Sequence, residues 1–335
     1  MSKNRGLFLM KRKIIAYNFV LTEALEQLDD RFEVEYFDGI NPKTDSAFLD
    51  ALKQAEGIVG LSLPVDKELL EHAPLLKIVS NNSTGFNNLS LEEMTKRGVM
   101  GTNTPGVLED TTADAIFGIL LAAARRIAEL DHFVKAGHWT GHLTTEQYAI
   151  DVHHKTLGII GMGRIGSTIA KRGHLGFDMK ILYHNRSRNI EAEEKYDATY
   201  CDLDTLLKKS DFVCLMTPLT PETENLIGER EFKLMKNSCV FVNGSRGKTV
   251  DESALIEALR NKEIYGAALD VYRIEPINEN HPLLQFPNVV TTPHIGSSTL
   301  ETELKMANLA VENLLAGLTG KRPKNLVNPE AFKGE

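Results

Sequence analysis

The sequence contains little cysteine and little tryptophan, with three cysteines and one tryptophan among 335 residues. The cysteines are odd in number and no pair has CxxC spacing, so neither a disulfide framework nor a zinc site of paired cysteines is indicated. Cys214 and Cys239 lie inside the apolar runs DFVCLM and NSCVFVN, which predicts that both thiols are buried and reduced. Such usage is typical of a cytoplasmic protein.

The sequence also lacks an excess of basic residues and any long apolar run. It has 46 acidic and 38 basic side chains, a net charge of −8, which argues against a general nucleic-acid-binding protein. No run approaches the ~20 apolar residues of a membrane-spanning helix, and the early patch LFLM is too short for a signal-peptide core. We therefore expect a soluble protein without membrane or nucleic-acid partners. Residues 1–12 are expected to be a loose extension, with Met10 as a plausible alternative start.

Apolar, strand-like runs alternate with amphipathic, helix-like segments along nearly the whole chain, which is typical of the α/β class. We predict a first series of strands at residues 13–18, 32–38, 57–62, 77–82 and 99–103. A second series is predicted at residues 156–161, 180–185, 198–201, 212–218, 239–244, 266–271 and 288–293. Several of these runs are apolar throughout, as expected for parallel strands that helices cover on both faces.

The length of the chain favours two domains. A helix-like segment at residues 299–318 follows the last strand and could pack back on the first domain. We therefore predict a discontinuous substrate domain of residues 1–104 and 300–335, a dinucleotide-binding domain of residues 105–299, and a cleft between them. Between the two strand series, a capping box from Thr111 to Asp114 predicts the start of one long helix. Its wide apolar face suits either a core helix or contact with a partner.

The segment GIIGMGRIG places Gly161, Gly163 and Gly166 in a GxGxxG motif. The motif follows an apolar strand and opens a helix, which favours a dinucleotide site over a glycine-rich turn without a ligand. Gly161 permits the tight turn, Gly163 lets the backbone approach a pyrophosphate, and Gly166 allows close packing of helix on strand. The first N–H groups of the helix, at Arg164 and Ile165, then face the anion.

The second strand of this series ends in YHNRSR, residues 183–188. Folds that prefer NAD place an acidic residue here to accept hydrogen bonds from the ribose. This chain has Asn185, Arg186, Ser187 and Arg188 instead, and a guanidinium pairs with the 2′-phosphate that a carboxylate would repel. We predict that Arg186 and Ser187 make the primary contacts to this phosphate and Arg188 a weaker one. Two solvated arginines at a strand end are the alternative.

Three further side chains each follow the end of a predicted strand, where open α/β sheets bind their ligands. Arg246 follows CVFVNG, Glu275 follows GAALDV and His294 follows NVVTTP. An arginine can bind a substrate carboxylate, and a histidine near a carboxylate forms an acid–base pair. Each residue alone could be an exposed turn residue, but suitable groups at successive strand ends predict a catalytic site.

Two other features do not predict a site. Adjacent residues on a strand point to opposite faces, and no carboxylate or cysteine stands at ligand spacing from His153 and His154. We therefore expect no metal at these histidines or elsewhere. We interpret Trp139 as a packing residue.

The segments GMGRIG, NGSRGKTVDESAL, ALDVYRIEP and NVVTTPHIGSST resemble, in order, the signatures of the D-2-hydroxyacid dehydrogenases. The resemblance runs from about Ile14 to Asn328. The segments DVHHKTLGIIGMGRIG and YCDLDTLLKKSDFVCLMTPLTPET further resemble the bacterial branch of glyoxylate/hydroxypyruvate and 2-ketogluconate reductases. The resemblance implies an α/β fold of two doubly wound parallel-sheet domains, a flavodoxin-like substrate domain and a Rossmann coenzyme domain. It also implies a homodimer formed through the coenzyme domain.

The resemblance implies a role for each matching residue. Arg246 would bind the substrate carboxylate and carbonyl, His294 would donate the proton, and Glu275 would hold His294 charged. The loop SNNSTGFNN would hold the substrate carboxylate through backbone N–H groups around Thr84 and Gly85. Asp270 would orient the nicotinamide carboxamide. All candidate cofactor contacts together are Gly161, Gly163, Arg164, Ile165, Gly166, Asn185, Arg186, Ser187, Arg188, Thr217, Pro218 and Asp270.

The chain departs from the family pattern at two places. Asn87 stands where the family usually has an aspartate, and Gly244 and Ser245 stand where an alanine commonly precedes the arginine. Neither change removes a catalytic group.

The implied reaction is the reduction of small 2-oxo acids, such as glyoxylate and hydroxypyruvate, to 2-hydroxy acids. NADPH would be the preferred cofactor, and NADH would be used less efficiently. A 2-ketogluconate or other sugar-acid reductase is the alternative within the family. An NAD(P)-sensing corepressor-like binding protein on the same fold is the alternative from another class.

Overall fold

The computed structural model describes residues 11–18, 20–28 and 30–334. Residues 1–108 with 299–335 form one compact unit, and residues 109–298 form a second. The predicted alternative start at Met10 and most of the predicted amino-terminal extension lie outside the described residues. Arg12, which was assigned to that extension, is instead the first residue of a strand, and its guanidinium donates to the carbonyl oxygen of Leu318.

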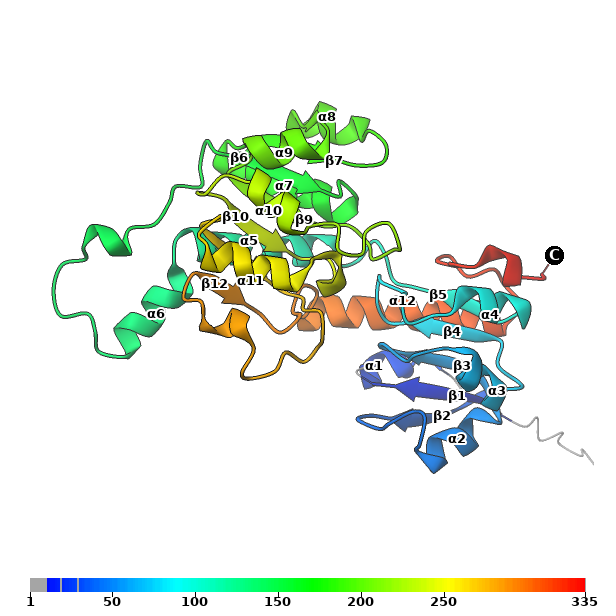
Figure 1. The fold of residues 1–335 in the computed structure, drawn as a ribbon. Coiled ribbons are helices and arrows are strands. Elements are labelled where there is room, and N and C mark those ends of the chain that lie inside the picture. Colours follow the sequence, from blue (N-terminus) through cyan, green and yellow to red (C-terminus); the bar gives the residue numbers. More distant parts are fainter. Residues whose placement is uncertain (1–10, 19, 29, 335) are drawn as a thin grey trace, which may run out of the picture. The chain divides into compact units, whose positions relative to one another are not determined.

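The first unit is a parallel sheet with the strand order β2-β1-β3-β4-β5 (Figure 1). Its strands are β1 (Arg12–Tyr17), β2 (Phe32–Phe37), β3 (Ala55–Gly60), β4 (Ile78–Asn81) and β5 (Met100–Thr102). Its helices are α1 (Thr22–Leu25), α2 (Ser46–Leu52), α3 (Lys67–His72), α4 (Leu91–Lys96) and α12 (Leu300–Leu318), with a 3-10 turn η4 (Pro329–Ala331).

Helices cover both faces of this sheet. Phe48, Leu70 and Met94 from α2, α3 and α4 pack in one buried cluster, and α1 and α12 contribute to a second cluster. The carboxyl-terminal helix packs closely, because a Cβ at Gly57 would lie 2.8 Å from Leu314 Cδ1. The fully buried hydroxyl of Ser80 in β4 donates to the carbonyl oxygen of Ala310 in α12. The last helix of the chain is therefore part of the core of the first unit.

The second unit is a parallel sheet with the strand order β12-β11-β10-β9-β6-β7-β8. Its strands are β6 (Thr156–Ile160), β7 (Lys180–His184), β8 (Thr199–Tyr200), β9 (Phe212–Leu215), β10 (Val240–Asn243), β11 (Gly266–Leu269) and β12 (Val289–Thr291). Its α-helices are α5 (Glu109–Ala124), α6 (Ile127–Lys135), α7 (Arg164–Phe177), α8 (Ile190–Tyr196), α9 (Leu203–Lys209), α10 (Glu229–Leu234) and α11 (Glu252–Arg260). Its 3-10 turns are η1 (Thr145–Gln147), η2 (Gly247–Thr249) and η3 (Pro282–Gln285).

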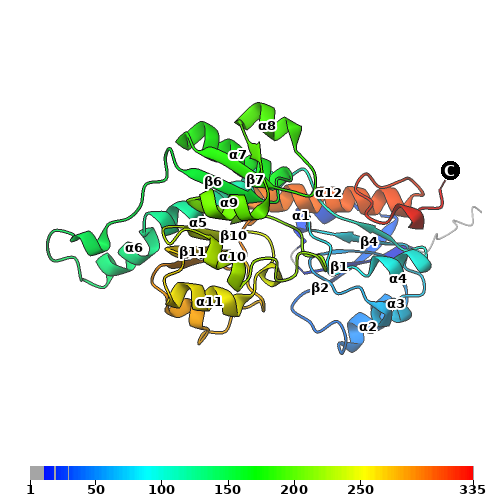
Figure 2. The same cartoon turned by 45° about the horizontal axis from the view of Figure 1, so that its top comes forward.

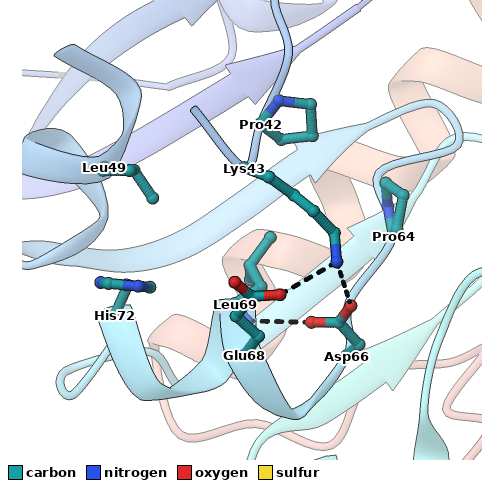
Figure 3. Close-up of a pocket in the computed structure, with 8 residues that line it drawn as sticks. All are labelled: Pro42, Lys43, Leu49, Pro64, Asp66, Glu68, Leu69 and His72. Carbon is teal, nitrogen blue, oxygen red and sulfur yellow. Dashed lines mark hydrogen bonds and ion pairs between the residues drawn. The ribbon is translucent and has the colours of Figure 1, made fainter. Parts of the chain in front are cut away.

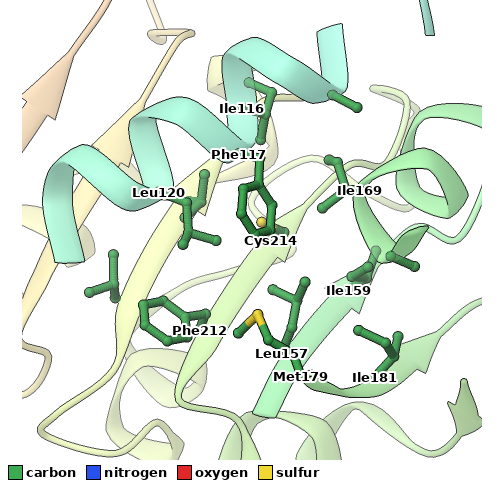
Figure 4. Packing of buried hydrophobic residues seen from close by; sticks show 14 of the residues in the cluster. Ile116, Phe117, Leu120, Leu157, Ile159, Ile169, Met179, Ile181, Phe212 and Cys214 are labelled. Carbon is green, nitrogen blue, oxygen red and sulfur yellow. The ribbon is translucent and has the colours of Figure 1, made fainter. Parts of the chain in front are cut away.

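Two buried clusters lie on opposite faces of this sheet, and Figure 2 shows its helices on both sides. In Figure 4, Ile116, Phe117 and Leu120 of α5 point toward Leu157 and Phe212 on the strands. Strand β6 lies between β7 and β9, so the chain proceeds in opposite directions from it. Such a reversal of strand order is where open α/β sheets bind ligands. Every predicted strand overlaps an observed one, which confirms the α/β class and the two parallel sheets.

The predicted long helix was wrong in two respects. It begins at Glu109, before Thr111, so the proposed capping box lies inside the helix. It also ends at Ala124, because Arg126 adopts a left-handed conformation with φ of 55°. The Arg126 guanidinium binds the Glu129 carboxylate and the carbonyl oxygens of Glu146 and Tyr148, which stabilises this break.

Two smaller interpretations also need correction. Trp139 does not pack in its own unit, since 63% of its surface is exposed. His153 and His154 are not on a strand but in the turn before β6, where their rings meet edge to face with centroids 4.9 Å apart.

Cys214 and Cys239 are fully buried and free, as predicted. None of the described helices is long and apolar enough to cross a membrane.

Candidate active site

The second unit brings Arg246, Glu275 and His294 to the carboxyl ends of neighbouring strands. Arg246 follows β10, Glu275 follows β11 and His294 follows β12, and these strands are adjacent and parallel in the sheet. Carboxyl ends of parallel strands lie along one edge, which explains why residues far apart in sequence meet here.

His294 and Glu275 form a direct pair. Nδ1 of His294 lies 2.7 Å from Oε2 of Glu275, and Oε1 of Glu275 accepts a hydrogen bond of 2.9 Å from the backbone N–H of Tyr272. Burial raises the pKa of Glu275, but the hydrogen bonds from His294 and Tyr272 and the charges of His294 and Arg246 outweigh it, so the pKa falls below its ordinary value. The carboxylate is therefore ionised at neutral pH and fixes the imidazole through Nδ1. Nε2 of His294 has no partner among the described residues, so it is the nitrogen that can exchange a proton with a ligand.

Asp270 holds the turn that carries His294. Its Oδ1 accepts hydrogen bonds from the Thr292 hydroxyl at 2.6 Å and the Ile295 N–H at 2.8 Å. Its Oδ2 accepts from the Gly296 N–H at 2.9 Å. His294 itself is left-handed, with φ of 56°, a conformation that a non-glycine residue keeps only when its surroundings enforce it. Sequence reasoning missed this positioning role of the buried Asp270 carboxylate, because its three donors become neighbours only in the folded turn.

Arg246 is partly buried beside this pair. Burial lowers the pKa of its guanidinium, and the charge of Glu275 acts in the opposite direction. Its Nη1 donates to the carbonyl oxygen of Ser245, at 2.6 Å. Its own carbonyl oxygen accepts from the Asn243 amide and the Thr249 hydroxyl. The backbone at Arg246 is thus fixed, while the side chain remains a cation that can bind a carboxylate.

The residue after Arg246 must be glycine. A Cβ at Gly247 would lie 1.9 Å from the carbonyl carbon and oxygen of Tyr272 and 2.4 Å from the nitrogen of Arg273. The segment that leads to Glu275 therefore lies directly against the segment that carries Arg246.

Glu252 holds the same loop from the other side. Its Oε2 accepts from the Arg273 N–H at 3.2 Å, and its Oε1 lies 3.1 Å from Nε2 of His281. Nδ1 of His281 accepts from the N–H of Leu283, at 3.3 Å, and so closes the far end of the loop. The loop 273–281 is therefore tied at both ends to the first turn of α11.

The glycine-rich loop has the geometry of an anion-binding turn. Gly161 has φ of 103°, and a Cβ there would lie 2.7 Å from the carbonyl of Met216. A Cβ at Gly166 would lie 2.2 Å from the carbonyl oxygen of Gly161, whereas Gly163 faces open space. Gly163 caps the 14-residue helix α7 without a side-chain hydrogen bond, so the first N–H groups of the helix, including those of Arg164 and Ile165, are not satisfied by a side-chain cap.

One observation beside this loop fits a bound dinucleotide. The Thr217 hydroxyl is buried without a hydrogen-bond partner in the described chain, which is expected where a ligand supplies the partner. Pro218 beside it is exposed. Asn185 is instead committed to the loop, since its Oδ1 accepts from the Met162 N–H at 2.8 Å. Asn185 thus holds the loop in place, and its contact with the cofactor stays a prediction.

The two arginines of the segment 185–188 differ. Nε of Arg188 donates to Oε1 of Glu193, at 3.0 Å, and its Nη2 donates to Oε2 of the same carboxylate. Arg186 and Ser187 are exposed and form no hydrogen bond within the described part of the chain. Two nitrogen atoms of Arg188 are therefore held by Glu193, whereas the guanidinium of Arg186 has no hydrogen bond to a described residue.

Thr84 and Gly85 lie in the first unit, on the loop after β4. Asn103 binds the carbonyl oxygen of Thr84 at 2.8 Å, and Asn81 binds that of Gly85 at 2.6 Å. The N–H groups of Thr84 and Gly85 donate to no described residue, which leaves them available to an anionic ligand. Next to this loop, the fully buried Asn82 amide and Thr104 hydroxyl also lack partners in the described chain, a feature that the sequence did not reveal.

A separate pocket of the first unit contains none of the predicted site residues. Figure 3 shows Lys43 bound to Asp66 at 3.3 Å and to Glu68 at 3.0 Å, so the charge of this lysine is already balanced. The pocket is lined by Pro42, Lys43, Leu49, Pro64, Asp66, Glu68, Leu69 and His72. The described residues contain no group of three or more potential metal ligands.

Comparisons with known proteins find relatives of a single enzyme family. Residues 117–296 match the family model described as D-isomer specific 2-hydroxyacid dehydrogenase, NAD binding domain. The chain is 47% identical over 321 residues to glyoxylate/hydroxypyruvate reductase B of Klebsiella pneumoniae, covering 96% of this chain and 99% of the relative. A relative of the same name from Salmonella newport is 46% identical over 322 residues, with the same coverage.

Solved structures agree with these sequence relatives. A protein of Thermus thermophilus superposes with a TM-score of 0.87 at 38% identity, covering 94% of this chain and 99% of the other. The NADPH-dependent glyoxylate/hydroxypyruvate reductase of Sinorhizobium meliloti, solved with NADP and malonate, has a TM-score of 0.86 at 29% identity. That match covers 97% of this chain and 99% of the other.

Proposed function

The chain belongs to the D-isomer-specific 2-hydroxyacid dehydrogenase family, and from this premise we propose that it reduces small 2-oxo acids, above all glyoxylate and hydroxypyruvate, with NADPH. The observation that carries the proposal is the cluster of Arg246, Glu275 and His294 at the ends of β10, β11 and β12. A cation for a carboxylate and a proton donor fixed by a carboxylate are the two groups that reduction of a 2-oxo acid requires.

In the proposed reaction, the guanidinium of Arg246 binds the carboxylate of the 2-oxo acid and orients its carbonyl. In the first unit, the N–H groups of Thr84 and Gly85 are a separate candidate for binding an anionic ligand. When bound, the reduced nicotinamide supplies a hydride to the carbonyl carbon. Nε2–H of His294 gives its proton to the carbonyl oxygen, and the product is a 2-hydroxy acid. Glu275 stabilises the imidazolium before this transfer through its bond to Nδ1.

Two features support NADPH as the preferred cofactor, with NADH used less efficiently. No acidic residue stands at the end of β7, between His184 and Arg188, and the Arg186 guanidinium forms no hydrogen bond with a described residue, although its charge acts on the carboxylate of Glu222. Arg186 and Ser187 can then bind the 2′-phosphate, while the start of α7 binds the pyrophosphate. Thr217 follows β9 and Asp270 follows β11, and both residues are further proposed contacts of the dinucleotide.

We also propose that the protein is a homodimer through the segment 127–148. Helix α6 has no buried residue, and it projects with the following loop away from the rest of the second unit (Figures 1 and 2). This segment carries the exposed apolar side chains Ile127, Val134, Trp139, Leu143 and Tyr148. A second copy of the chain is the occupant that the family resemblance favours, and it would remove this apolar surface from water.

The test is a set of initial rates with glyoxylate, hydroxypyruvate and 2-ketogluconate, each with NADPH and with NADH. The proposal predicts the highest kcat/KM for glyoxylate or hydroxypyruvate with NADPH. A higher value for 2-ketogluconate would establish the sugar-acid alternative. Cofactor binding without turnover of any of these acids would instead support a dinucleotide-sensing protein.

A further inference from the structure

The segment that follows β7 contains an acidic group that the sequence does not reveal. Glu193 lies on the first turn of α8, and its side chain is 17% exposed. Its Oε1 accepts hydrogen bonds from the Tyr183 hydroxyl at 2.5 Å and from Nε of Arg188 at 3.0 Å. Its Oε2 accepts from Nη2 of Arg188. The hydrogen bonds from Arg188 and Tyr183 lower the pKa of Glu193, so it is an anion that one guanidinium neutralises.

A short chain of hydrogen bonds connects Glu193 to the glycine-rich loop. The hydroxyl of Tyr183, which donates to Glu193, accepts from the Asn189 N–H at 2.7 Å. The Asn189 amide then donates to the carbonyl oxygen of Met162 at 2.9 Å, inside the GxGxxG turn. The carboxylate therefore belongs to the same hydrogen-bonded cluster as the proposed dinucleotide site.

The position of the Glu193 carboxylate affects whether the 2′-phosphate of NADP(H) can bind at the end of β7. An acidic group near the end of the second strand favours the free ribose hydroxyls of NAD and repels a 2′-phosphate. Here the acid is five residues beyond Arg188, on the next helix, where a search for an acid at the strand end does not find it. Its charge would act on the phosphate if Arg188 did not compensate for it.

We propose that Glu193 is a masked acidic group and that Arg188 favours NADP(H) by neutralising it, whereas Arg186 contacts the 2′-phosphate directly. The inference rests on the proposed preference for NADPH and assigns different tasks to the two arginines. Substitution of Arg188 alone leaves the negative charge of Glu193 uncompensated. Substitution of Glu193 by a neutral residue as well removes that charge. If Arg188 instead touched the phosphate, removal of Glu193 could not compensate for its loss.

The experiment measures the Kd values of NADP⁺ and NAD⁺ by calorimetry for the wild type and five variants. Arg188→Ala is expected to weaken NADP⁺ binding by about tenfold, the effect of one uncompensated charge near a phosphate, and to leave NAD⁺ binding nearly unchanged. The double variant Arg188→Ala/Glu193→Gln is expected to return the Kd of NADP⁺ to within about threefold of the wild type. Arg188→Lys keeps the charge, so it should retain most of the affinity.

The matched control is Glu191→Gln combined with Arg188→Ala. Glu191 lies on the same helix and forms its own pair with Lys195, at 2.6 Å, so its removal should not restore NADP⁺ affinity. A double variant with Glu193→Gln that binds NADP⁺ as weakly as Arg188→Ala alone would overturn the inference. Rescue by Glu191→Gln as well would overturn it too, because any reduction of negative charge would then suffice.

An Arg186→Ala variant separates this inference from the proposed function. If the wild type prefers NADP⁺ and Arg186→Ala removes that preference, the proposed cofactor selectivity holds whatever the Glu193 variants do. A wild type that binds NADP⁺ no more tightly than NAD⁺ would overturn both the proposed preference and the inference.

Discussion

At the scale of single residues, the chemistry depends on how His294 and Arg246 are held. His294 is bound by Glu275 through its side chain and by Asp270 through the backbone around it. The sequence predicted that Arg246, Glu275 and His294 lie at the ends of strands, because each follows an apolar run. It could not predict the donors to Asp270 or the pairing of Arg188 with Glu193, since these contacts depend on how turns fold and on side-chain conformations.

The first prediction concerns Glu275→Gln. The pKa of Glu275 lies below its ordinary value, so its carboxylate stays ionised at neutral pH and for some way into the acid range, and that charge favours the imidazolium that reduction consumes. Protonation of Glu275 should therefore weaken the pair only below the ordinary titration range of a glutamate. In Glu275→Gln a neutral amide replaces the carboxylate that fixes Nδ1 of His294, so kcat/KM for reduction should fall by about tenfold or more at neutral pH. The check is kcat/KM for hydroxypyruvate against pH, and identical profiles for variant and wild type would contradict the role of this pair.

The second prediction concerns Arg246→Lys. Lysine keeps the positive charge but loses the planar, two-pronged geometry that binds a carboxylate. We expect KM for the 2-oxo acid to rise and kcat to fall, with a total loss in kcat/KM of about ten- to hundredfold. The Kd of NADP⁺ should be nearly unchanged. Steady-state kinetics and cofactor titration measure both, and an unchanged KM would argue against substrate binding by Arg246.

At the scale of elements, the site depends on the packing of the segment after β10, the loop after β11 and the first turn of α11. The segment after β10 contacts the start of the loop after β11 at Gly247, and Glu252 in the first turn of α11 ties that loop at Arg273 and His281. Apolar runs predicted the strands well because helices cover both faces of each sheet, although the edge strands β2 and β8 are largely exposed. The long helix was predicted wrongly because nothing in the run around Arg126 marks a left-handed residue, and only its contacts with Glu129 and the carbonyls of Glu146 and Tyr148 explain the break.

The third prediction tests that packing with Gly247→Ala. The new Cβ would overlap the carbonyl of Tyr272, so the loop with Glu275 must move. We expect a loss of about 1–3 kcal/mol in the free energy of unfolding and a clear loss of kcat. The control is Gly118→Ala in α5, where a Cβ meets nothing within 4 Å and the helix should gain up to about 1 kcal/mol. Equal stability of the two variants in denaturant unfolding would contradict the packing argument.

At the scale of the whole molecule, the chain passes from the first unit to the second and returns to the first in α12. The proposed catalytic side chains Arg246, Glu275 and His294 are all in the second unit, which also carries the glycine-rich loop. The first unit carries the loop with Thr84 and Gly85. Alternation of strands and helices predicted this architecture, whereas composition alone gave no indication that the apolar segment 127–148 is exposed.

The fourth prediction tests the proposed dimer with Trp139→Ser. A large aromatic side chain at a symmetric interface is removed twice in each dimer, so the dissociation constant of the dimer should rise by roughly tenfold or more. Leu75→Ser is the control, because Leu75 is 54% exposed but lies in the first unit. Light scattering after size-exclusion chromatography over a dilution series measures the mass. A wild type that is monomeric at every concentration would refute the dimer.

The central claim is that His294 donates a proton during NADPH-dependent reduction of a 2-oxo acid. The most direct measurement is the rate of hydroxypyruvate reduction by His294→Gln, together with the Kd of NADP⁺ for the same protein. The account predicts a fall in kcat of roughly 10²–10⁴-fold with cofactor affinity preserved, which is the usual contribution of a general acid. A variant that reduces hydroxypyruvate at the wild-type rate would contradict the account.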